Sequence, residues 1–308
     1  MPSSKIIIIA GPTASGKSGL ALDLAQACDG VVINADSMQV YKDIPILAAT
    51  PSFQDMEIAP HKLYGIYDAS IRGNMVDWFN LTVNEINQAR AQNKTPIVVG
   101  GTGMYIEALT KGITPIPETP QEIRNEISNL LREKGLDFLY QELTSKDPET
   151  AARLSSNDTT RIRRALEVLK HTQTTMSEWQ KVPLKQFFAS EELIPVYINP
   201  LRKDLDERGR LRFDIMMNMG ALEEVQKLMT RNLSDSLPAM RALGVQELES
   251  YLKGETGKEE AIEAAKLHTR QYAKRQSTWF NNRFQADFCL KSCYNHDKYF
   301  VDDIKKAL

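Results

Sequence analysis

The sequence has few cysteines, no long apolar run and no large excess of one charge. Its cysteines, Cys28, Cys289 and Cys293, are few and odd in number, which excludes a disulfide-rich scaffold. The apolar run Ile6–Ala10 is too short for a membrane span or for the core of a signal peptide. We therefore expect a cytoplasmic protein without membrane contact. A net charge of −2 gives no overall attraction to nucleic acid, so any polyanion site must be a local basic patch.

Residues with metal-ligand spacing are also scarce. Cys289, Cys293 and His296 lie close together in the sequence, but a fourth ligand at the spacing of a zinc site is missing. We therefore interpret the cysteines as buried or idle thiols.

The chain of 308 residues is longer than a typical single domain, so a main core with a second domain or an insertion is expected. Three apolar segments, Ile6–Ala10, 31–33 and 96–99, alternate with helical segments. This alternation predicts an α/β fold with a parallel sheet covered by helices. Ligands bind outside the carboxyl ends of such strands, so we expect three loops to converge on one site: residues 11–18, 34–39 and 100–103.

The character of the sequence changes after Gly112. Residues 114–120 contain three prolines and suit a linker. Residues 121–180 have helical spacing, and residues 192–198 have the pattern of a strand that returns to the sheet. The sequence therefore predicts a core formed by residues 1–113 and 192–308, with a mostly helical insertion domain at 114–191.

A phosphate-binding motif, Gly11-Pro12-Thr13-Ala14-Ser15-Gly16-Lys17-Ser18, follows the first predicted strand and precedes a helix-like stretch. Strand, loop and helix in this order are the context that G-x-x-x-x-G-K-[ST] requires, and they predict a P-loop NTPase-like sheet. Backbone N–H groups and the helix N-terminus surround an anion, while Lys17 adds a charge and Ser18 a ligand for Mg²⁺. We expect a di- or triphosphate to bind here, through Gly11, Thr13, Ala14, Ser15, Gly16, Lys17 and Ser18.

An acidic residue that would complete a nucleotide-hydrolysing site is hard to place. The strand at 96–99 runs into Gly100-Gly101-Thr102-Gly103, which offers hydrogen bonds but no carboxylate. The acidic residue at a strand end is instead Asp36. At this point two interpretations of Asp36 remain open, a general base acting on a second substrate or the N-cap of the next helix.

Basic residues cluster in two segments, one at residues 161–164 and one at residues 269–283. The second segment has no acidic residue between its cations, and its amides and rings could contact base edges and stack on an unpaired base. RNA binding and a solvated helix face both fit this pattern. The second segment lies in a helix expected at 258–284.

A further helix is expected at residues 203–231, with a bend at Gly209 or Gly220. Its residues Arg208 and Arg212 are four apart and share one face, so both could reach an anion. Pairing of these arginines with Glu207 or Asp204 is the alternative.

Five blocks spread along nearly the whole chain together resemble the tRNA dimethylallyltransferase family. They are the phosphate loop at residues 11–18, Asn34-Ala35-Asp36-Ser37-Met38-Gln39-Val40-Tyr41, Val99-Gly100-Gly101-Thr102-Gly103-Met104-Tyr105, the segment 157–168 around Arg161-Ile162-Arg163-Arg164, and Thr269-Arg270-Gln271-Tyr272-Ala273-Lys274-Arg275-Gln276-Ser277-Thr278-Trp279-Phe280.

The resemblance implies transfer of a dimethylallyl group from dimethylallyl diphosphate to N6 of adenosine 37, adjacent to the anticodon in tRNA. The phosphate loop would then hold a diphosphate that leaves as pyrophosphate, which accounts for the missing acidic strand end. Asp36 would accept the N6 proton, and Lys17, Thr102, Mg²⁺ at Ser18, and Arg208 or Arg212 would stabilise the leaving group. The adenine would flip out of its stack to reach this site.

The resemblance also implies contacts with the anticodon stem-loop by a protein that is expected to be a monomer. The implied contacts are Asp36, Ser37, Met38, Gln39, Thr102, Arg124, Thr160, Arg161, Ile162, Arg163, Arg164, Arg241, Gln246, Lys274, Arg275 and Gln276.

The sequence departs from the family pattern in three places. Ile46-Leu47-Ala48-Ala49-Thr50-Pro51 stands where the family usually has Ile-Gly-Thr-Ala-Lys-Pro, and Pro60-His61-Lys62-Leu63 where it has Pro-His-His-Leu. Gly244-Val245-Gln246-Glu247 lacks the aromatic and the cation of the usual Gly-Tyr-[Arg/Lys]-Glu. These departures bear on substrate choice or efficiency more than on reaction class.

Three other functions remain as alternatives. A relative that prenylates free adenine nucleotides would share the phosphate-loop chemistry, but the two basic blocks argue against it. A small-molecule kinase would need the acidic metal ligand that we could not place. A non-catalytic RNA-binding relative is suggested by the departures.

Overall fold

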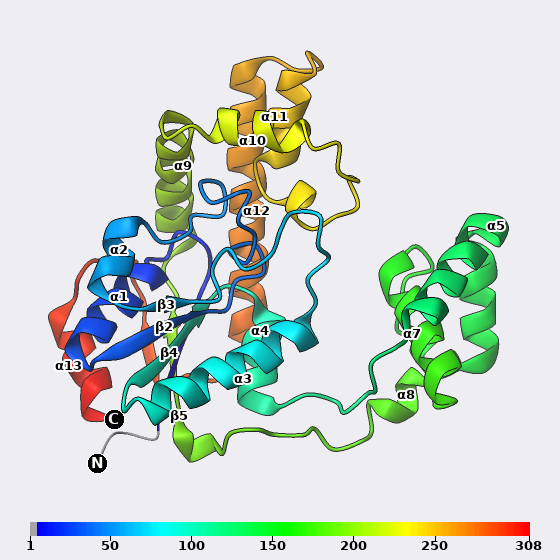
Figure 1. The fold of residues 1–308 in the computed structure, drawn as a ribbon, viewed down its shortest axis with the longest axis horizontal. Coiled ribbons are helices and arrows are strands. Elements are labelled where there is room, and N and C mark those ends of the chain that lie inside the picture. Colours follow the sequence, from blue (N-terminus) through cyan, green and yellow to red (C-terminus); the bar gives the residue numbers. More distant parts are fainter. Residues whose placement is uncertain (1–4) are drawn as a thin grey trace. The chain divides into compact units, whose positions relative to one another are not determined.

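The computed structural model describes residues 5–308, which divide into two compact units (Figure 1). Of the described residues, the larger unit comprises 5–110 and 188–308, and the smaller unit comprises 111–187. The smaller unit begins and ends slightly before the predicted insertion at 114–191. In the described part of the chain, no helix has the length and apolarity needed to cross a membrane.

The larger unit is built on a six-stranded sheet in the order β3-β2-β4-β1-β5-β6, and every pair of neighbours is parallel. The predicted parallel sheet is therefore confirmed. The strands are β1 (Ile6–Ala10), β2 (Gly30–Asn34), β3 (His61–Lys62), β4 (Thr95–Gly100), β5 (Leu193–Ile198) and β6 (Phe288–Leu290).

Apolar runs account for the four longer strands, because a strand covered on both faces is apolar throughout. Every residue of β1, β2 and β4 is buried. The return of the chain into the sheet as β5, beside β1, is also confirmed. The two short edge strands, β3 and β6, were not predicted from the sequence.

Helices cover both faces of the sheet. Leu20 and Leu24 of α1 and Val301 and Ile304 of α13 are buried in one core cluster with strand residues such as Ile7. The helix α3 packs on β2 and β4. The helices of the larger unit are α1 (Lys17–Ala27), α2 (Phe53–Ile58), α3 (Met75–Ala91), α4 (Gly103–Lys111), α9 (Arg202–Asn218), α10 (Ala221–Met229), α11 (Val245–Leu252), α12 (Lys258–Arg283) and α13 (Lys298–Lys306), with single 3₁₀ turns at Ser190–Glu192 and Ala239–Arg241.

The predicted helix at 203–231 is two helices, α9 and α10, which are separated at Gly220, one of the two positions where a bend was expected. Gly220 has a φ of 101°, a left-handed conformation that glycine adopts without strain. Gly209 lies inside α9 and does not interrupt it. The predicted helix at 258–284 is confirmed as α12, within one residue at its end.

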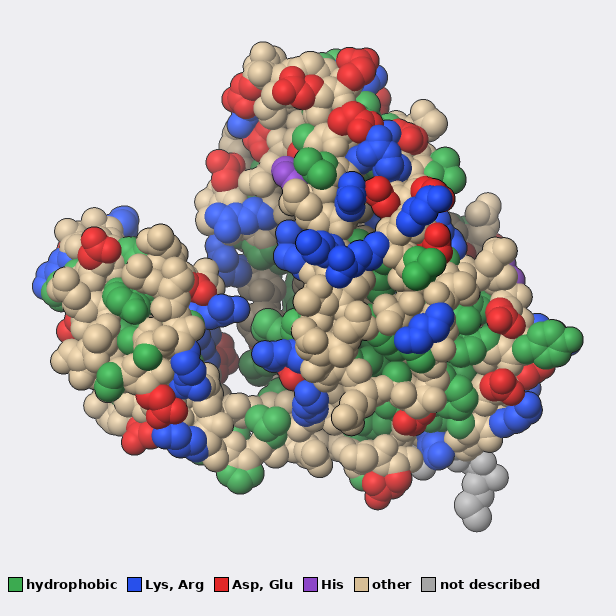
Figure 2. Space-filling model, turned by 180° about the vertical axis from the view of Figure 1, so that it is seen from behind, with side chains coloured by type: hydrophobic (Ala, Val, Ile, Leu, Met, Phe, Trp, Pro, Cys, Tyr) green, Lys and Arg blue, Asp and Glu red, His purple; other side chains and the backbone are tan. Residues whose placement is uncertain are grey.

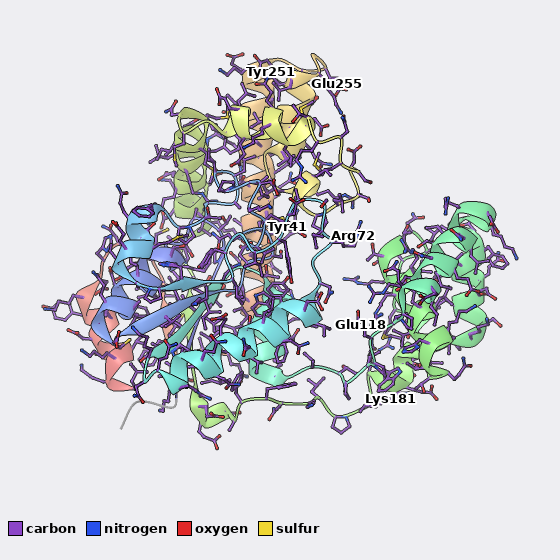
Figure 3. All side chains as sticks on the ribbon, viewed as in Figure 1. Tyr41, Arg72, Glu118, Lys181, Tyr251 and Glu255 are labelled. Atoms are coloured by element: carbon purple, nitrogen blue, oxygen red, sulfur yellow. The ribbon has the colours of Figure 1, made fainter. Side chains whose placement is uncertain are left out.

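The regular elements of the smaller unit are helices, as the sequence indicates, and an isolated β-bridge between Ile113 and Lys185 joins its two ends. It consists of α5 (Gln121–Lys146), α6 (Pro148–Ala151), α7 (Thr159–Thr172) and α8 (Met176–Trp179). A separate core joins α5 and α7 through Leu139, Leu143, Ile162 and Leu166. Glu118 precedes α5 and Lys181 follows α8 in the sequence (Figure 3), and they pair with Arg124 and Glu149, respectively.

The loops after β2 and β4 approach so closely that only glycine fits between them. A Cβ atom at Gly100 would lie 2.0 Å from the carbonyl oxygen of Ala35. The backbone N–H of Ala35 donates to the Val99 carbonyl at 2.8 Å, and that of Thr102 donates to the Ala35 carbonyl at 3.3 Å. This contact fixes the spacing of two of the loops that the sequence predicts to converge.

We predict that Gly100→Ala lowers the free energy of unfolding by about 3 kcal/mol, because the added methyl group must push two backbones apart. Chemical denaturation of the variant measures this loss. Gly257→Ala is the matched control, since a Cβ there meets nothing within 4 Å and its φ is −74°. Equal stability of the two variants would contradict the close approach.

Candidate active site

The phosphate loop joins β1 to α1, which begins at Lys17. Gly16 has a φ of 93°, and a Cβ there would lie 2.7 Å from the carbonyl oxygen of Tyr294, so this position requires glycine. Lys17 Nζ donates to the Pro12 carbonyl at 2.7 Å. The loop thus has the turn and the lysine placement of a phosphate-binding site at a helix N-terminus.

Three charged side chains interact at this loop: Lys17, Asp36 and Arg212. Burial lowers the pKa of Lys17 to about 8, Asp36 opposes that shift, and Arg212 adds to it. Burial also lowers the pKa of Arg212, again opposed by Asp36. The Arg212 guanidinium donates to Thr13 Oγ1, which ties α9 to the loop. Two desolvated cations therefore share one carboxylate, which leaves a local excess of positive charge.

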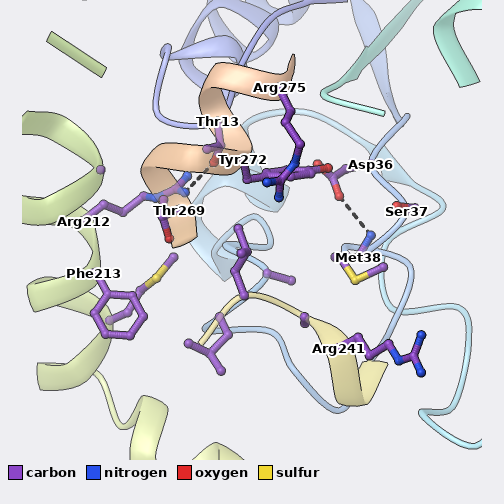
Figure 4. Close-up of a pocket in the computed structure, with 16 residues that line it drawn as sticks. Thr13, Asp36, Ser37, Met38, Arg212, Phe213, Arg241, Thr269, Tyr272 and Arg275 are labelled. Atoms are coloured by element: carbon purple, nitrogen blue, oxygen red, sulfur yellow. Dashed lines mark hydrogen bonds between the residues drawn. The ribbon is translucent and has the colours of Figure 1, made fainter. Parts of the chain in front are cut away.

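Asp36 follows β2 and is held in a tight turn. Its carboxylate accepts a hydrogen bond from the backbone N–H of Met38 at 2.9 Å (Figure 4), and its own N–H donates to the Asn34 side chain at 2.7 Å. The N-cap interpretation is wrong, because the next helix, α2, begins at Phe53 and is capped by Ser52. One carboxylate oxygen of Asp36 thus stabilises the turn, and the residue also lines a cavity.

Thr102 lies against the Asp36 turn. Its hydroxyl accepts from the Ser37 N–H at 2.9 Å and donates to the Ser37 hydroxyl at 3.2 Å. The residue thereby positions the loop that carries Asp36. Direct contact of Thr102 with a leaving group stays a prediction.

The predicted RNA contact of Gln276 is wrong. Its side chain is 6% exposed, accepts from the Thr13 N–H at 2.8 Å and donates to the Gly101 carbonyl at 2.9 Å. Both ends of the amide are therefore used inside the protein. Gln276 holds α12 against two loops of the site and cannot offer its amide to a base edge.

A cavity of about 350 Å³ opens beside Asp36 (Figure 4). Its polar wall carries Asp36, Arg212 and Arg241, while Phe213 and Met216 form part of an apolar wall. The other lining residues are Thr13, Ser37, Met38, Leu47, Ala48, Gly209, Ala242, Leu243, Thr269, Tyr272 and Arg275.

A second cavity, of about 300 Å³, lies over the phosphate loop. It is lined by Ala14, Gly16, Lys17, Ser18, Gly19, Arg208, Leu211, Arg212 and Ile215. Arg212 lines both cavities, so the cavity over the phosphate loop adjoins the cavity beside Asp36. Arg208 donates to the Tyr294 carbonyl at 3.2 Å, while Glu207 pairs with Lys203 rather than with either arginine.

Among the other predicted RNA contacts of the larger unit, some side chains are exposed and one is already hydrogen-bonded within the protein. Lys274 and Gln246 are exposed, and Arg275 is exposed beside the ring of Tyr272, 5.7 Å from its centroid. Gln39 donates through its amide to the carbonyls of Ala48 and Ala49, so its amide nitrogen is used within the loop. Lys and Arg side chains gather over the α12 side of this unit (Figure 2).

The predicted contacts of the smaller unit lie on and before α7. Arg161 and Thr160 are exposed, Arg163 donates to Ser128, and Arg164 donates to Thr119. Arg124, on α5, pairs with Glu118. Ile162 is fully buried in the core of this unit, so the prediction that it contacts RNA is wrong for its side chain.

Sequence reasoning missed Glu224 and did not place Leu47, Ala48 and Tyr272 in the cavity. The loop at Leu47 and Ala48, where the sequence departs from the family pattern, lines the larger cavity. Glu224 of α10 holds this loop by accepting from the N–H groups of Ile46 and Leu47 at 2.8 and 2.9 Å. Tyr272 also lines the cavity, and burial together with Asp36 raises its pKa.

Comparison with known proteins agrees with this geometry. The family model described as IPP transferase matches residues 39–283. A tRNA dimethylallyltransferase of Beijerinckia indica subsp. indica is 41% identical over 300 residues, covering 97% of this chain and 99% of the relative. One of Allorhizobium ampelinum is 44% identical over 277 residues, covering 90% and 91% of the two chains.

Solved structures are similar over nearly the whole chain. The full-length tRNA isopentenylpyrophosphate transferase of Bacillus halodurans matches with a TM-score of 0.71 at 30% identity. The match covers 99% of this chain and 95% of that protein. A eukaryotic dimethylallyltransferase acting on tRNA has a TM-score of 0.84 at 30% identity, with coverage of 99% and 78%. With a parallel sheet, a phosphate loop and these matches in agreement, the chain belongs to the IPP transferase family.

Proposed function

We propose that the protein transfers a dimethylallyl group from dimethylallyl diphosphate to N6 of adenosine 37 in tRNA, with release of pyrophosphate. The observation that carries this proposal is the position of Arg212, which lines both the cavity over the phosphate loop and the cavity beside Asp36. One space suits an anion and the other suits an acceptor with a proton to lose. The names of the relatives point to the same reaction.

In the proposed reaction, the allylic carbon loses its bond to the diphosphate oxygen and gains a bond to N6. The electron pair of the broken bond goes to the diphosphate, where Lys17 and the arginines stabilise the added negative charge. The N6 proton goes to the Asp36 carboxylate, whose position is fixed by Met38 and Thr102 through Ser37. No phosphoryl group is transferred, so an acidic strand end is not needed.

We further propose that Mg²⁺ assists at the phosphate loop. Ser18 is exposed in the cavity there, and the buried hydroxyl of Ser15 has no hydrogen-bond partner among residues 5–308, so the loop has polar groups that fit a metal-bound diphosphate. No cluster of three or more His, Cys, Asp or Glu within that range could hold a metal alone. Magnesium would therefore be held by Ser18 together with diphosphate oxygens and water, and it supplies neutralising charge when bound.

The tRNA would be held by cations that project from the protein surface. Lys274, Arg275 and Arg241 are exposed on the larger unit, and Arg161 is exposed on the smaller one. We propose that the anticodon stem-loop contacts these residues and that both units take part. We also propose that the enzyme acts as a monomer and, since it acts on tRNA, that it is located in the cytoplasm.

Labelled dimethylallyl diphosphate tests the reaction directly. With Mg²⁺, we expect label to enter an anticodon stem-loop that has adenosine 3′ to the anticodon, and not the same stem-loop with guanosine there. Free AMP, and ATP with small acceptors, are offered in parallel. Label on AMP but never on RNA would favour the nucleotide-prenylating alternative, and γ-phosphate transfer would favour a kinase.

We predict that Asp36→Asn lowers kcat by about 10²-fold or more, because it removes a general base. The asparagine oxygen can still accept the hydrogen bond from Met38, so the turn is kept. Asp36→Ala, which removes base and turn together, provides the comparison. If Asp36→Asn retained full turnover while Asp36→Ala did not, Asp36 would serve only to hold the turn.

We predict that replacing Lys274 and Arg275 by alanine weakens tRNA binding and reduces the slope of log K against log salt by about 1.5, as expected for two lost phosphate contacts. Equilibrium binding measured over a series of salt concentrations gives the slope. Lys258→Ala is the control, since Lys258 is exposed at the opposite end of the same helix. An unchanged slope in the double variant would remove this part of α12 from the interface.

A further inference from the structure

Tyr294 is a buried residue next to the phosphate loop that the proposed reaction does not use. It lies between β6 and α13, beyond the region 39–283 that the family model matches, and it is 3% exposed. Its position depends on the last segment of the chain, because β6 pairs with β5 and α13 packs on α1. A residue placed in this way is rigidly supported from two sides.

The backbone of Tyr294 contacts the phosphate loop directly. Its N–H donates to the Ser15 carbonyl at 2.9 Å. Its carbonyl oxygen also lies close to Gly16, since a Cβ at that position would be 2.7 Å from it. Tyr294 therefore restrains the loop just before the helix N-terminus that would receive an anion.

The same carbonyl oxygen accepts a hydrogen bond from the Arg208 guanidinium at 3.2 Å. Arg208 is exposed and lines the cavity over the phosphate loop, and a long side chain of this kind loses much rotamer freedom when it is held. Tyr294 thus positions a cation at the mouth of the anion site, besides restraining the loop.

The side chain of Tyr294 is anchored on α1. Its hydroxyl donates to Asp23 at 2.5 Å, and its ring lies 3.6 Å from the position that a Cβ at Gly19 would occupy. His296 also bonds to the Asp23 carboxylate, at 2.8 Å. These contacts keep the Tyr294 backbone in the place where it meets the loop and Arg208.

We propose that Tyr294 is a positioning residue for diphosphate binding, which holds the phosphate loop and Arg208 in the arrangement that receives the anion. This inference rests on the proposed function, since the anion is the diphosphate of the prenyl donor. Tyr294 itself touches no reacting atom. Its loss should therefore weaken donor binding and leave the acceptor side unaffected.

The test combines calorimetric titration with pyrophosphate and Mg²⁺ and steady-state kinetics of prenyl transfer to the stem-loop. We expect Tyr294→Ala to raise the Kd for pyrophosphate and the KM for dimethylallyl diphosphate about tenfold, because an anion site that is not preorganised binds more weakly. The KM for the stem-loop should change by less than about twofold, whereas kcat at saturating donor should fall by no more than the Kd for pyrophosphate rises, because Arg208 also stabilises the charge that the diphosphate gains. Tyr294→Phe keeps the ring and the backbone but loses the hydrogen bond to Asp23, so it should raise the same Kd only about threefold.

Tyr299→Ala is the matched control, because Tyr299 is 84% exposed in the following helix. If Tyr294→Ala does not fold, Asp23→Ala removes the anchor of the hydroxyl alone and should raise the same Kd about threefold. A folded Tyr294→Ala, or Asp23→Ala in its place, with unchanged pyrophosphate affinity would overturn the proposal. Because pyrophosphate binding is measured without transfer, failure of the proposed reaction would be seen separately, as wild-type protein that binds pyrophosphate but does not label RNA.

Discussion

The buried side-chain amide of Gln276 connects three parts of the larger unit that are distant in sequence. It accepts from the backbone of Thr13 in the phosphate loop and donates to the Gly101 carbonyl after β4, while its own backbone belongs to α12. A Cβ at Gly101 would lie 2.3 Å from the Gln276 nitrogen, so the glycine leaves the space that the amide needs. Because an unsatisfied buried amide is costly, the three elements keep their places together.

The order of the strands explains why these loops meet. β1 lies between β4 and β5 in the sheet, and β2 lies on the other side of β4, so the loops after β1, β2 and β4 leave the same edge. The phosphate loop, the Asp36 turn and the Gly100–Thr102 segment are then neighbours, and Thr102 links the last two through Ser37. The C-terminal part of the chain closes this edge with α9, which supplies Arg208 and Arg212, and with α12.

The phosphate loop, Asp36 and the four longer strands could be predicted because each has a local signal, such as a motif, a charged residue at a strand end or an apolar run. Gln276 was misassigned because it stands in a basic segment, although its spacing to Ala273, Ser277 and Phe280 places it on the buried face of α12. Ile162 shares the apolar stripe of α7 in the same way. Tyr294 gave no local signal, since its contacts with Ser15 and Arg208 depend on the position of the last strand and helix.

The electrostatics of the site favour an anion that gains charge during the reaction. Burial disfavours the charged forms of Lys17 and Arg212 and lowers the pKa of each. The negative charge of Asp36 offsets part of that cost for both. A diphosphate would restore the balance, and the charge that it gains as its bond to carbon breaks would interact more strongly with both cations than the ground state does. Proton transfer to Asp36 would at the same step remove the negative charge that competes for these cations. In the proposed reaction, base and leaving group would thereby be coupled through two shared cations, which would explain how a loop common in phosphoryl transfer can serve alkyl transfer.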